Sequence, residues 1–314
     1  MARFVRGSAL AIAWAIVGFS AAMLIARQVG VTQITVVAVL VGMQFAAIPT
    51  ALAAAVFASA RSRIGAGIAV AMTILLAGIQ IPQFLTDDHT ATGPEVTVLS
   101  VNVAHGEADA QSIVDQVRSS DADILAVQEL TPAEVRDLTS AGIDELLPYN
   151  FTAALPVADG TGLWSRTPLT DGVRLSNFGF VPVQANTVVD GVDLTVVSFH
   201  AMSPATPRHT VKWAEDLAHM RTLMDTYQGT VLVAGDFNAT GDHRQFRDLA
   251  SAGFRDAAES AGSGLFRTFP SSRPLARLDH VVTSAGVDAL EVAPVPIPDS
   301  DHLAVSARLR LPAN

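Results

Sequence analysis

The chain contains 314 residues, of which 50% are apolar and only 16% are charged, and its formal net charge is −10. This composition excludes a disordered chain, and a mean hydropathy of +0.37 is too high for a typical cytosolic enzyme. Because the sequence has no cysteine, disulfides, thiol nucleophiles and zinc–thiolate centres are also excluded.

The apolar excess lies in the first 86 residues, which contain five Arg and no Lys, Asp or Glu. Three uncharged stretches fill this segment, at residues 7–26, 28–60 and 64–86. Each is long enough for a helix that crosses a bilayer, which needs roughly 20 apolar residues. Residues 1–86 are therefore predicted to form an anchor of three transmembrane helices. Three such stretches in succession disfavour the alternative, which is a set of buried core helices.

The arginines predict the orientation of these helices. Arg3, Arg6, Arg61 and Arg63 fall on one side of a three-span layout and Arg27 alone on the other, so the positive-inside rule places the N-terminus in the cytoplasm. Three spans then make this a multi-pass protein of the cell membrane with its remaining residues outside. If the first stretch were instead a cleaved signal peptide, the remaining residues would still lie outside.

Residues 87–95 are mostly polar, contain Gly and Pro, and are predicted to form a short linker. Residues 96–314 are predicted to form a globular domain. Because this part of the chain, with the linker, holds the other 15 of the 20 basic residues and all 30 acidic residues, its net charge is −15.

Short apolar runs alternate with helical periods in this domain. They predict strands at 96–103, 123–127, 151–155, 162–165, 183–189, 192–199, 231–234, 278–282 and 303–311. Helices are predicted at 110–118, from Thr131-Pro132 onward, and at 207–227. Asp190-Gly191 is a typical hairpin turn, and hairpins mixed with helices predict a layered α+β fold.

Polar side chains gather where the apolar strands end or begin. They are Asn102, Glu129, His200, Asp236, Asn238, Asp279, His280, Asp301 and His302. A buried acid at a strand end costs several kcal/mol unless it is paired or bound to a cation. One such residue is usually structural, but this many carboxylates, amides and histidines together indicate one convergent site.

This set resembles the endonuclease/exonuclease/phosphatase superfamily, whose members include DNase I, abasic-site endonucleases, neutral sphingomyelinases and inositol-polyphosphate 5-phosphatases. The matching strings are SVNV at 100–103, VQE at 127–129, LWSRTPL at 163–169, FHAMSP at 199–204, GDFNA at 235–239, RLDHV at 277–281 and SDH at 300–302. The resemblance implies a four-layer α/β sandwich of the DNase I-like type, with two sheets flanked by helices and the site at one end.

The resemblance also implies roles for these residues in an in-line attack of water on phosphorus. Glu129 matches the principal metal ligand, supported by Asn102 and Asp301, and such hard oxygen ligands suit Mg²⁺ or Mn²⁺. The remaining matches are His302 as the catalytic imidazole, Asp279 as its orienting carboxylate, Asp236 and Asn238 as the pair that positions the water, and His200 as a phosphate contact.

Several residues keep a structural alternative. In isolation Asn102 would cap a turn, His200 would be a core histidine and Asp279 would pair with Arg277. His280 is interpreted as structural, and Arg166 fits a structural ion pair as well as a phosphate contact. Four further histidines are also interpreted as structural, namely His105, His209, His219 and His243.

Charge and architecture favour a lipid substrate over nucleic acid. Lys212 is the single lysine, and there is no basic run to bind a phosphate backbone. A membrane-tethered site favours a membrane lipid or lipid-linked phosphate, and the architecture resembles the VanJ-type teicoplanin-resistance membrane proteins. An extracellular nuclease is one alternative. A catalytically inactive scaffold that binds cell-wall precursors is another, although Glu129, Asp236 and His302 are all present.

Overall fold

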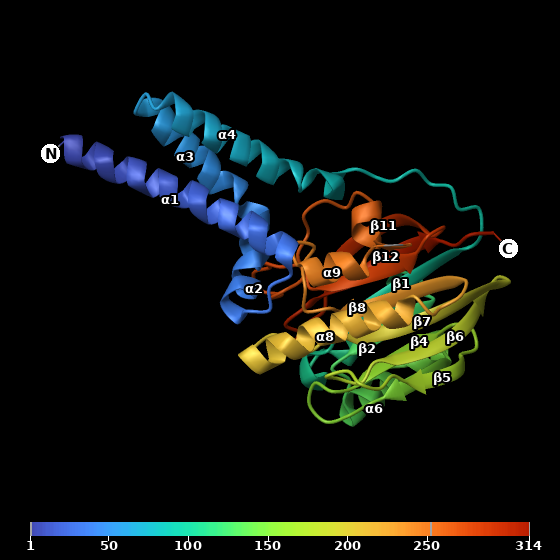
Figure 1. The fold of residues 1–314 in the computed structure, drawn as a ribbon. Coiled ribbons are helices and arrows are strands. Elements are labelled where there is room, and N and C mark those ends of the chain that lie inside the picture. The colour runs from blue at the N-terminus through green and yellow to red at the C-terminus, as the bar shows by residue number, and fades with distance from the viewer. Residues whose placement is uncertain (1, 252, 314) are drawn as a thin grey trace. The chain divides into compact units, whose positions relative to one another are not determined.

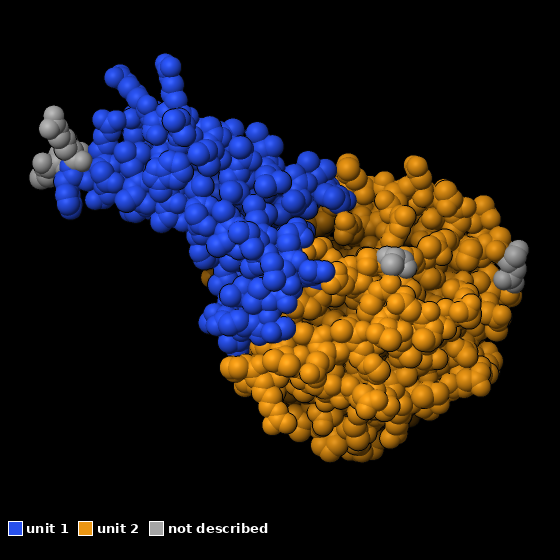
Figure 2. Space-filling view, viewed as in Figure 1, with its two compact units in different colours: residues 1–82, 242–244 blue, residues 83–241, 245–314 orange. Residues whose placement is uncertain are grey.

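The computed structural model describes residues 2–251 and 253–313, which form two compact units (Figure 1). The first unit comprises residues 1–82 together with 242–244, and the second comprises the rest of the chain (Figure 2). The second unit therefore holds the predicted globular domain, apart from Asp242, His243 and Arg244.

The first unit is a bundle of helices. They are α1 (Ala2–Val29), α2 (Ile34–Leu40), the 3-10 helix η1 (Val41–Phe45), α3 (Ala47–Ser59) and α4 (Arg63–Gly78), followed by η2 (Ile81–Phe84) at the boundary with the second unit. Phe57 is fully buried at the centre of the bundle. A Cβ on Gly65 would lie 2.5 Å from the Phe57 ring, so only glycine permits α3 and α4 to pack this closely.

The prediction of three separate transmembrane helices is not supported. Among the described residues, Phe4–Val29 is the one unbroken helix long and apolar enough to span a membrane. The second stretch is bent by 69° between η1 and α3. In a continuous helix the ring of Pro49 would clash with the carbonyl of Phe45, four residues earlier, so the helix breaks before Pro49. The third, α4, has 16 residues and is about 24 Å long, shorter than a bilayer core of ~30 Å.

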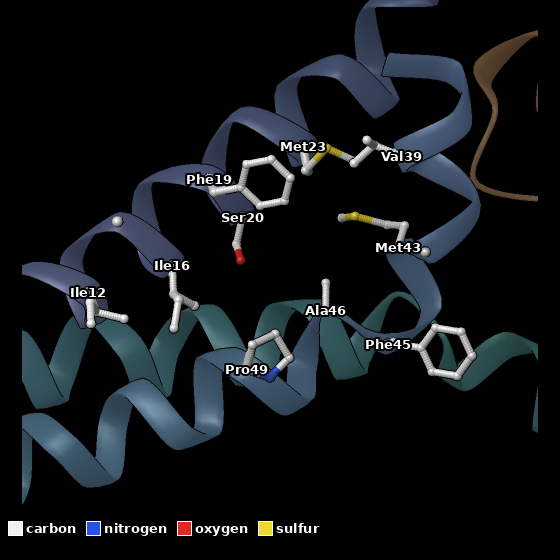
Figure 3. Close-up of a pocket in the computed structure, with 12 residues that line it drawn as sticks. Ile12, Ile16, Phe19, Ser20, Met23, Val39, Met43, Phe45, Ala46 and Pro49 are labelled. Atoms are coloured by element: carbon white, nitrogen blue, oxygen red, sulfur yellow. The ribbon is translucent and has the colours of Figure 1, made fainter. Parts of the chain in front are cut away.

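The bend opens an apolar groove in the first unit. Figure 3 shows side chains of α1, η1 and α3 around a space of about 590 Å³. Phe19 and Met23 line it from α1, Met43 lines it from η1, and the hydroxyl of Ser20 is one polar group beside it.

The second unit contains two six-stranded sheets. The first has the order β11-β12-β1-β2-β4-β3 and consists of β1 (Glu95–Asn102), β2 (Ile124–Gln128), β3 (Tyr149–Ala153), β4 (Thr161–Ser165), β11 (Asp288–Pro296) and β12 (Leu303–Arg310). The second has the order β5-β6-β7-β8-β10-β9 and consists of β5 (Thr170–Arg174), β6 (Val183–Val189), β7 (Val192–His200), β8 (Thr230–Asp236), β9 (Phe254–Asp256) and β10 (Asp279–Ser284). All nine predicted strands are present. The sequence patterns missed β5, β9 and β11.

Alternation along the strands divides the core. In β1, Val96 and Val98 face the layer between the two sheets, whereas Leu99 and Val101 face the helices. The helices of this unit are α5 (Ala110–Ser119), α6 (Pro132–Ser140), α7 (Ile143–Leu146), α8 (Pro207–Met224), α9 (Arg244–Leu249) and α10 (Ala257–Ser260), with the 3-10 turn η3 (Ala104–Gly106). The result is the predicted mixed α+β two-sheet sandwich.

The centre of each sheet is a parallel strand pair joined by a helix. In the first sheet β1 pairs with β2 through α5, and in the second β7 pairs with β8 through α8. Asn102 lies opposite Gln128 in the first pair, and His200 lies opposite Asp236 in the second. Parallel strands end at the same edge of a sheet, so each pair delivers two polar residues to one edge.

The predicted linker is bonded to the second unit. The backbone N–H of Asp87 donates to the carbonyl of Ser260 at 2.9 Å, and its carboxylate pairs with Arg255 at 2.7 Å. The N–H of Ala91 donates to the Asp288 carboxylate at 2.6 Å. These bonds limit the freedom of the segment, so it is not a free flexible tether.

One buried acid makes the stability of this unit depend on pH. Glu134 lies in the first turn of α6, is 1% exposed, and has one carboxylate oxygen without a hydrogen-bond partner among the described residues. Burial first, and then the charges of Asp137 and Asp109, raise the pKa of Glu134 from 4.5 to about 7. Between these values the folded protein keeps a proton that the unfolded chain releases, so stability falls as the pH rises through this window.

We expect Glu134→Gln to remove this loss, because the amide has the same shape but does not titrate. Thermal unfolding of the full chain between pH 4.5 and 8 should show a variant more stable than the wild type at the alkaline end, by up to about 3 kcal/mol. Glu145→Gln, on the exposed surface, should follow the wild type. Parallel curves for Glu134→Gln and the wild type would contradict the assignment.

Candidate active site

The strand ends of both sheets meet in one cluster. Asp236, at the end of β8, lies directly opposite Asp279 at the start of β10. The Nδ2 of Asn102, which ends β1 in the other sheet, donates to Asp236 Oδ2 at 3.2 Å and to Glu129 Oε1 at 3.2 Å. The sandwich therefore brings together residues that are up to 177 positions apart in the chain.

Asp236 is the centre of the cluster and is 2% exposed. Its Oδ1 accepts the backbone N–H of Asn238 at 2.8 Å, and its Oδ2 accepts from Asn102. Burial raises the pKa of Asp236 to about 8, with the Asp279 charge acting in the same direction and the His302 charge opposing it. A carboxyl with a pKa near neutrality can accept or release a proton at working pH.

His302 and Asp279 form an oriented pair. His302 follows the turn before β12, and its Nδ1 lies 2.9 Å from Asp279 Oδ2. Its Nε2 lies 3.7 Å from Asp236 Oδ2. Burial alone would lower the pKa of His302, but the charges of Asp279 and Asp236 outweigh it and raise the pKa to about 10. The ring is therefore an imidazolium at neutral pH.

Glu129 follows β2 and is the least enclosed of the cluster carboxylates, with 14% of its side chain exposed. Its Oε2 accepts the backbone N–H of His105 at 2.8 Å and lies 2.9 Å from that ring's Nδ1. The sequence interpretation treated His105 as merely structural. One feature of the sequence could have indicated that His105 belongs to the site: it lies in the turn directly after Asn102.

The imidazole of His200 lies near the carboxylates of Asp236 and Glu129. Its Nε2 is 3.6 Å from Asp236 Oδ2 and 3.9 Å from Glu129 Oε1. The ring stacks on Phe180 with centroids 4.2 Å apart, a partner that sequence patterns did not indicate. Burial lowers the pKa of His200 to about 3, so the ring is neutral and can donate or accept one hydrogen bond.

Several residues around the cluster have a left-handed backbone. Non-glycine residues with left-handed φ include Ala104 at 46°, His105 at 61°, Glu129 at 59° and Asn238 at 49°. Such conformations persist only where the surroundings enforce them, and they are typical of functional sites. The Nδ2 of Asn238 donates to the carbonyl of Ala201 at 3.0 Å, which holds the loops after β7 and β8 together.

The other predicted site residues lie as follows. Asp301 is exposed beside the cluster, where its charge adds to the raised pKa of His302. Arg277 pairs with Asp256 at 2.5 Å rather than with Asp279, which pairs with His302. His280 is structural, because its Nδ1 faces Asp256 at 3.2 Å and its Nε2 faces the Ala239 carbonyl at 2.9 Å.

Arg166 forms a structural network. Its guanidinium pairs with Asp121 at 2.6 Å and with Asp123 at 3.0 Å, and it donates to the Ala122 carbonyl at 3.0 Å. These bonds join the end of β4 to the turn before β2. These structural contacts explain the presence of Arg166 in its motif, so no contact between Arg166 and phosphate is needed to explain it.

The donor set fits a hard divalent cation. Asp236 and Asp279 place carboxylate oxygens within 4.8 Å of each other, and Glu129 adds a partly exposed carboxylate beside them. His302 lies within the same distance, but as an imidazolium it donates hydrogen bonds and does not bind a cation. Concentrated negative charge in a buried cluster is relieved by a cation, and oxygen donors suit Mg²⁺ or Mn²⁺. The Oδ1 of Asn102 accepts from the Ala104 N–H, and its NH₂ group donates to the carboxylates of Glu129 and Asp236. Its role as a metal ligand stays a prediction.

Comparisons with solved structures agree with this architecture. A humanized D. rerio TDP2 with 14 mutations matches at a TM-score of 0.58 and 16% identity, over 68% of this chain and 98% of that chain. An endonuclease/exonuclease/phosphatase from Beutenbergia cavernae matches at 0.54 and 19% identity, over 70% and 72%. A family protein from Bacteroides thetaiotaomicron matches at 0.52 and 16% identity, over 71% and 100%.

No curated protein matches the chain in sequence. The model of the Endonuclease/Exonuclease/phosphatase family, by contrast, matches residues 99–302, which extend from β1 to the catalytic imidazole expected at His302. Members of this family are typically hydrolases of phosphate esters and usually use a divalent metal ion. By fold, by the order of its motifs and by the geometry of its site, the chain belongs to the Endonuclease/Exonuclease/phosphatase family.

Proposed function

We propose that this protein is a membrane-anchored, divalent-metal-dependent phosphoesterase that hydrolyses a lipid-linked phosphate, pyrophosphate or phosphodiester outside the cell membrane. The observation that carries the proposal is the cluster of Glu129, Asp236 and the His302–Asp279 pair on a chain whose first helix is long and apolar enough to span a bilayer.

The arrangement suits in-line attack of water on phosphorus. The Nε2–H of the imidazolium at His302 and Oδ2 of Asp236 face the same small space, at 3.7 Å from each other. His302 stabilises charge that develops on a phosphoryl oxygen, and the ionised form of Asp236, which becomes populated as the pH approaches about 8, accepts the proton of the attacking water. Asn238 holds the other oxygen of Asp236 in place through its backbone N–H.

A divalent cation, when bound, would neutralise the phosphate charge and polarise the phosphoryl group. Glu129 would hold it, with the exposed carboxylate of Asp301 close to the same edge. Asn102 keeps the Glu129 carboxylate oriented through its donated hydrogen bond.

Two features support a lipid-linked substrate over nucleic acid. Residues 87–314 carry a net charge of −15 and one lysine, Lys212, so a polyanion would approach a surface of like charge. An anchored enzyme meets membrane-embedded substrates at high effective concentration. The apolar groove of about 590 Å³ in the first unit also offers space to a hydrocarbon chain.

The arginines support an outward-facing site. The Arg6 guanidinium donates to the Ala60 carbonyl at 2.5 Å, so it lies at the turn that carries Arg61 and Arg63, whereas Arg27 lies near the other end of α1. This distribution favours a cytoplasmic N-terminus and a first helix that leads outward.

We expect Glu129→Gln and His302→Ala each to reduce kcat by about 10² or more, because they remove the charge that balances the cation and the imidazolium. Hydrolysis of a soluble phosphodiester by the full chain in detergent measures this. EDTA should abolish the activity and Mg²⁺ or Mn²⁺ should restore it. His89→Ala, on an exposed segment, is the matched control, and full activity in His302→Ala would refute the mechanism.

The His302–Asp279 pair predicts a specific pH dependence. In the wild type, kcat should fall on the alkaline side as His302 loses its proton near pH 10. Asp279→Asn removes the adjacent negative charge that raises the pKa of His302, so the alkaline limb should move to lower pH by about one unit or more. Measurement of kcat against pH for both proteins tests this. An alkaline limb at the same pH in both would show that the titration of His302 does not set that limb.

The substrate class is tested with the solubilised full chain on a panel of polyprenyl pyrophosphate, phospholipids, sphingomyelin and DNA. We expect release of phosphate or head group from a lipid and little cleavage of DNA, since DNA meets a surface of like charge. Right-side-out vesicles should hydrolyse externally added lipid substrate, and inside-out vesicles should not. Efficient DNA cleavage with every lipid left intact would favour the nuclease alternative.

A further inference from the structure

The loop between β5 and β6, residues 175–182, borders the catalytic cluster. Its Phe180 stacks on the His200 ring, with centroids 4.2 Å apart and planes 24° apart. The last torsion of a histidine side chain has a broad energy minimum, so the stack fixes the plane of this ring more closely than the torsion does. In that plane the His200 Nε2 lies 3.6 Å from Asp236 Oδ2 and 3.4 Å from Asn238 Nδ2. The placement of Phe180 therefore affects the geometry of the cluster.

A buried carboxylate of α8, Asp216, binds this loop. Among the residues of α8, all of which the structure describes, Asp216 is the one buried charged side chain, and it is 0% exposed. Its Oδ1 accepts the Gly179 N–H at 3.0 Å, and its Oδ2 accepts the Met202 N–H at 3.0 Å. The Nζ of Lys212, one turn earlier, lies 3.0 Å from Oδ1. Because an enclosed carboxylate is costly without such partners, these bonds are strongly favoured in the folded chain.

Two further contacts of α8 hold the residues just before Phe180. The Lys212 ammonium donates to the Asn177 carbonyl at 2.8 Å. The ring of Phe178 packs against His219 of α8, with centroids 4.6 Å apart. Together with the bond from Gly179 to Asp216, these contacts fix three successive residues of the loop to one face of the helix.

The residue after Phe180 is held differently. The Val181 N–H donates to the Asp159 carbonyl at 2.9 Å, and the Val181 carbonyl accepts from Thr161 Oγ1 at 2.8 Å. A residue that is fixed on one side only can still turn about its own two backbone torsions. The bond at Gly179 is therefore needed, in addition to those at Val181, to set the direction of the Phe180 side chain.

Gly179 makes this bond sensitive to substitution of its partner. A Cβ on Gly179 would lie 2.7 Å from Cε of Met202 and 3.0 Å from Oδ2 of Asp216, so a larger residue would displace the carboxylate. Glycine also has more backbone freedom than any other residue type. Once its N–H is released, the segment before Phe180 has no side chain at this position to hold it.

We propose that Asp216, together with Lys212, positions Phe180 over His200 and thereby sets the direction of the His200 imidazole in the site. Asp216 and Lys212 are thus positioning residues for phosphoester hydrolysis. Lys212, the single lysine of the chain, is then engaged in holding this loop. The effect on hydrolysis rests on the proposed function, whereas the effect on Phe180 and His200 does not.

Asp216→Asn tests the proposal in the full chain in detergent. The amide keeps the shape of the carboxylate but places an NH₂ group where one oxygen accepts, so a bond to Gly179 or Met202 is lost. We expect faster amide hydrogen exchange over residues 177–180. The kcat on a soluble phosphodiester should be about 10- to 100-fold lower with KM nearly unchanged, because misplacement of a group in the site affects the chemical step.

A spectroscopic measurement separates positioning from a general loss of stability. The ring current of Phe180 shifts the ring-proton signals of His200 upfield, and in Asp216→Asn these signals should move downfield. The chain has eight histidines, so in a histidine-labelled sample the signals of His200 are assigned by their loss in His200→Gln. A folded Asp216→Asn with wild-type exchange and unmoved His200 signals would overturn the proposal.

Asp225→Asn is the matched control. Asp225 also pairs with a basic residue four positions earlier, Arg221 at 2.8 Å, but its side chain is 55% exposed. This variant should equal the wild type in exchange, in the His200 signals and in kcat. Equal changes in Asp225→Asn and Asp216→Asn would contradict a specific role for Asp216.

Lys212→Met decides the question if Asp216→Asn fails to fold. It removes the bond to the Asn177 carbonyl and leaves the N–H donors of Asp216 in place. Exchange over residues 177–180 and the His200 signals should change in the same direction as in Asp216→Asn, by a smaller amount. No change in either would overturn the proposal.

Phe180→Leu tests the last step, from the stack to hydrolysis. It removes the ring itself, so the His200 signals should move downfield and kcat should fall about 10- to 100-fold. Wild-type kcat in this variant would overturn the positioning role in hydrolysis. Should the wild type cleave no phosphoester, the proposed function fails, and exchange over residues 177–180 with the His200 signals still decides whether Asp216 positions Phe180.

Discussion

The site depends on one constraint, which is that several carboxylates are enclosed within a few ångströms of one another. Asp236 and Asp279 are each 2% exposed and lie opposite each other across the β8–β10 register. Like charges this close cannot all ionise freely in a poorly solvated space, so the cluster holds extra protons. Burial first, and then the Asp279 charge, raise the pKa of Asp236, whereas the charges of Asp279 and Asp236 raise the pKa of His302. The same excess of negative charge favours a divalent cation.

The two sheets supply the geometry that this cluster requires. Each parallel pair ends at one edge, and the packing of sheet on sheet brings those edges together, so Asn102 can bridge Glu129 and Asp236 through a single amide. Because the carboxylates are fixed by strands, they cannot separate to relieve their repulsion. The hydrogen bonds from backbone N–H groups at His105 and Asn238 offset part of that cost.

Much of this could be predicted from the sequence, because polar residues at the ends of apolar strands are visible in the pattern. The Asp236, Asp279 and His302 group was predicted in this way. His105 and Phe180 were not predicted, since His105 enters the site through a left-handed turn and Phe180 lies in a loop and stacks on His200. The three uncharged stretches misled for a similar reason: their length indicates membrane helices, but the bend before Pro49 depends on backbone geometry that hydropathy does not report.

The same reasoning explains why the loop after β8 needs contacts beyond strand pairing. Strand pairing fixes β8 as far as Asp236, and beyond that residue the ladder can no longer constrain the backbone. Asn238 must nevertheless hold a left-handed conformation to orient Asp236. A helix or strand cannot supply that restraint, whereas fixed points on both flanks can. His280 provides one from the neighbouring strand β10, where its Nε2 faces the Ala239 carbonyl, and the hydrogen bond from Asn238 Nδ2 to the Ala201 carbonyl, just after β7, provides the other. The left-handed position beside Asp236 is thus held from both strands that flank β8 in its sheet.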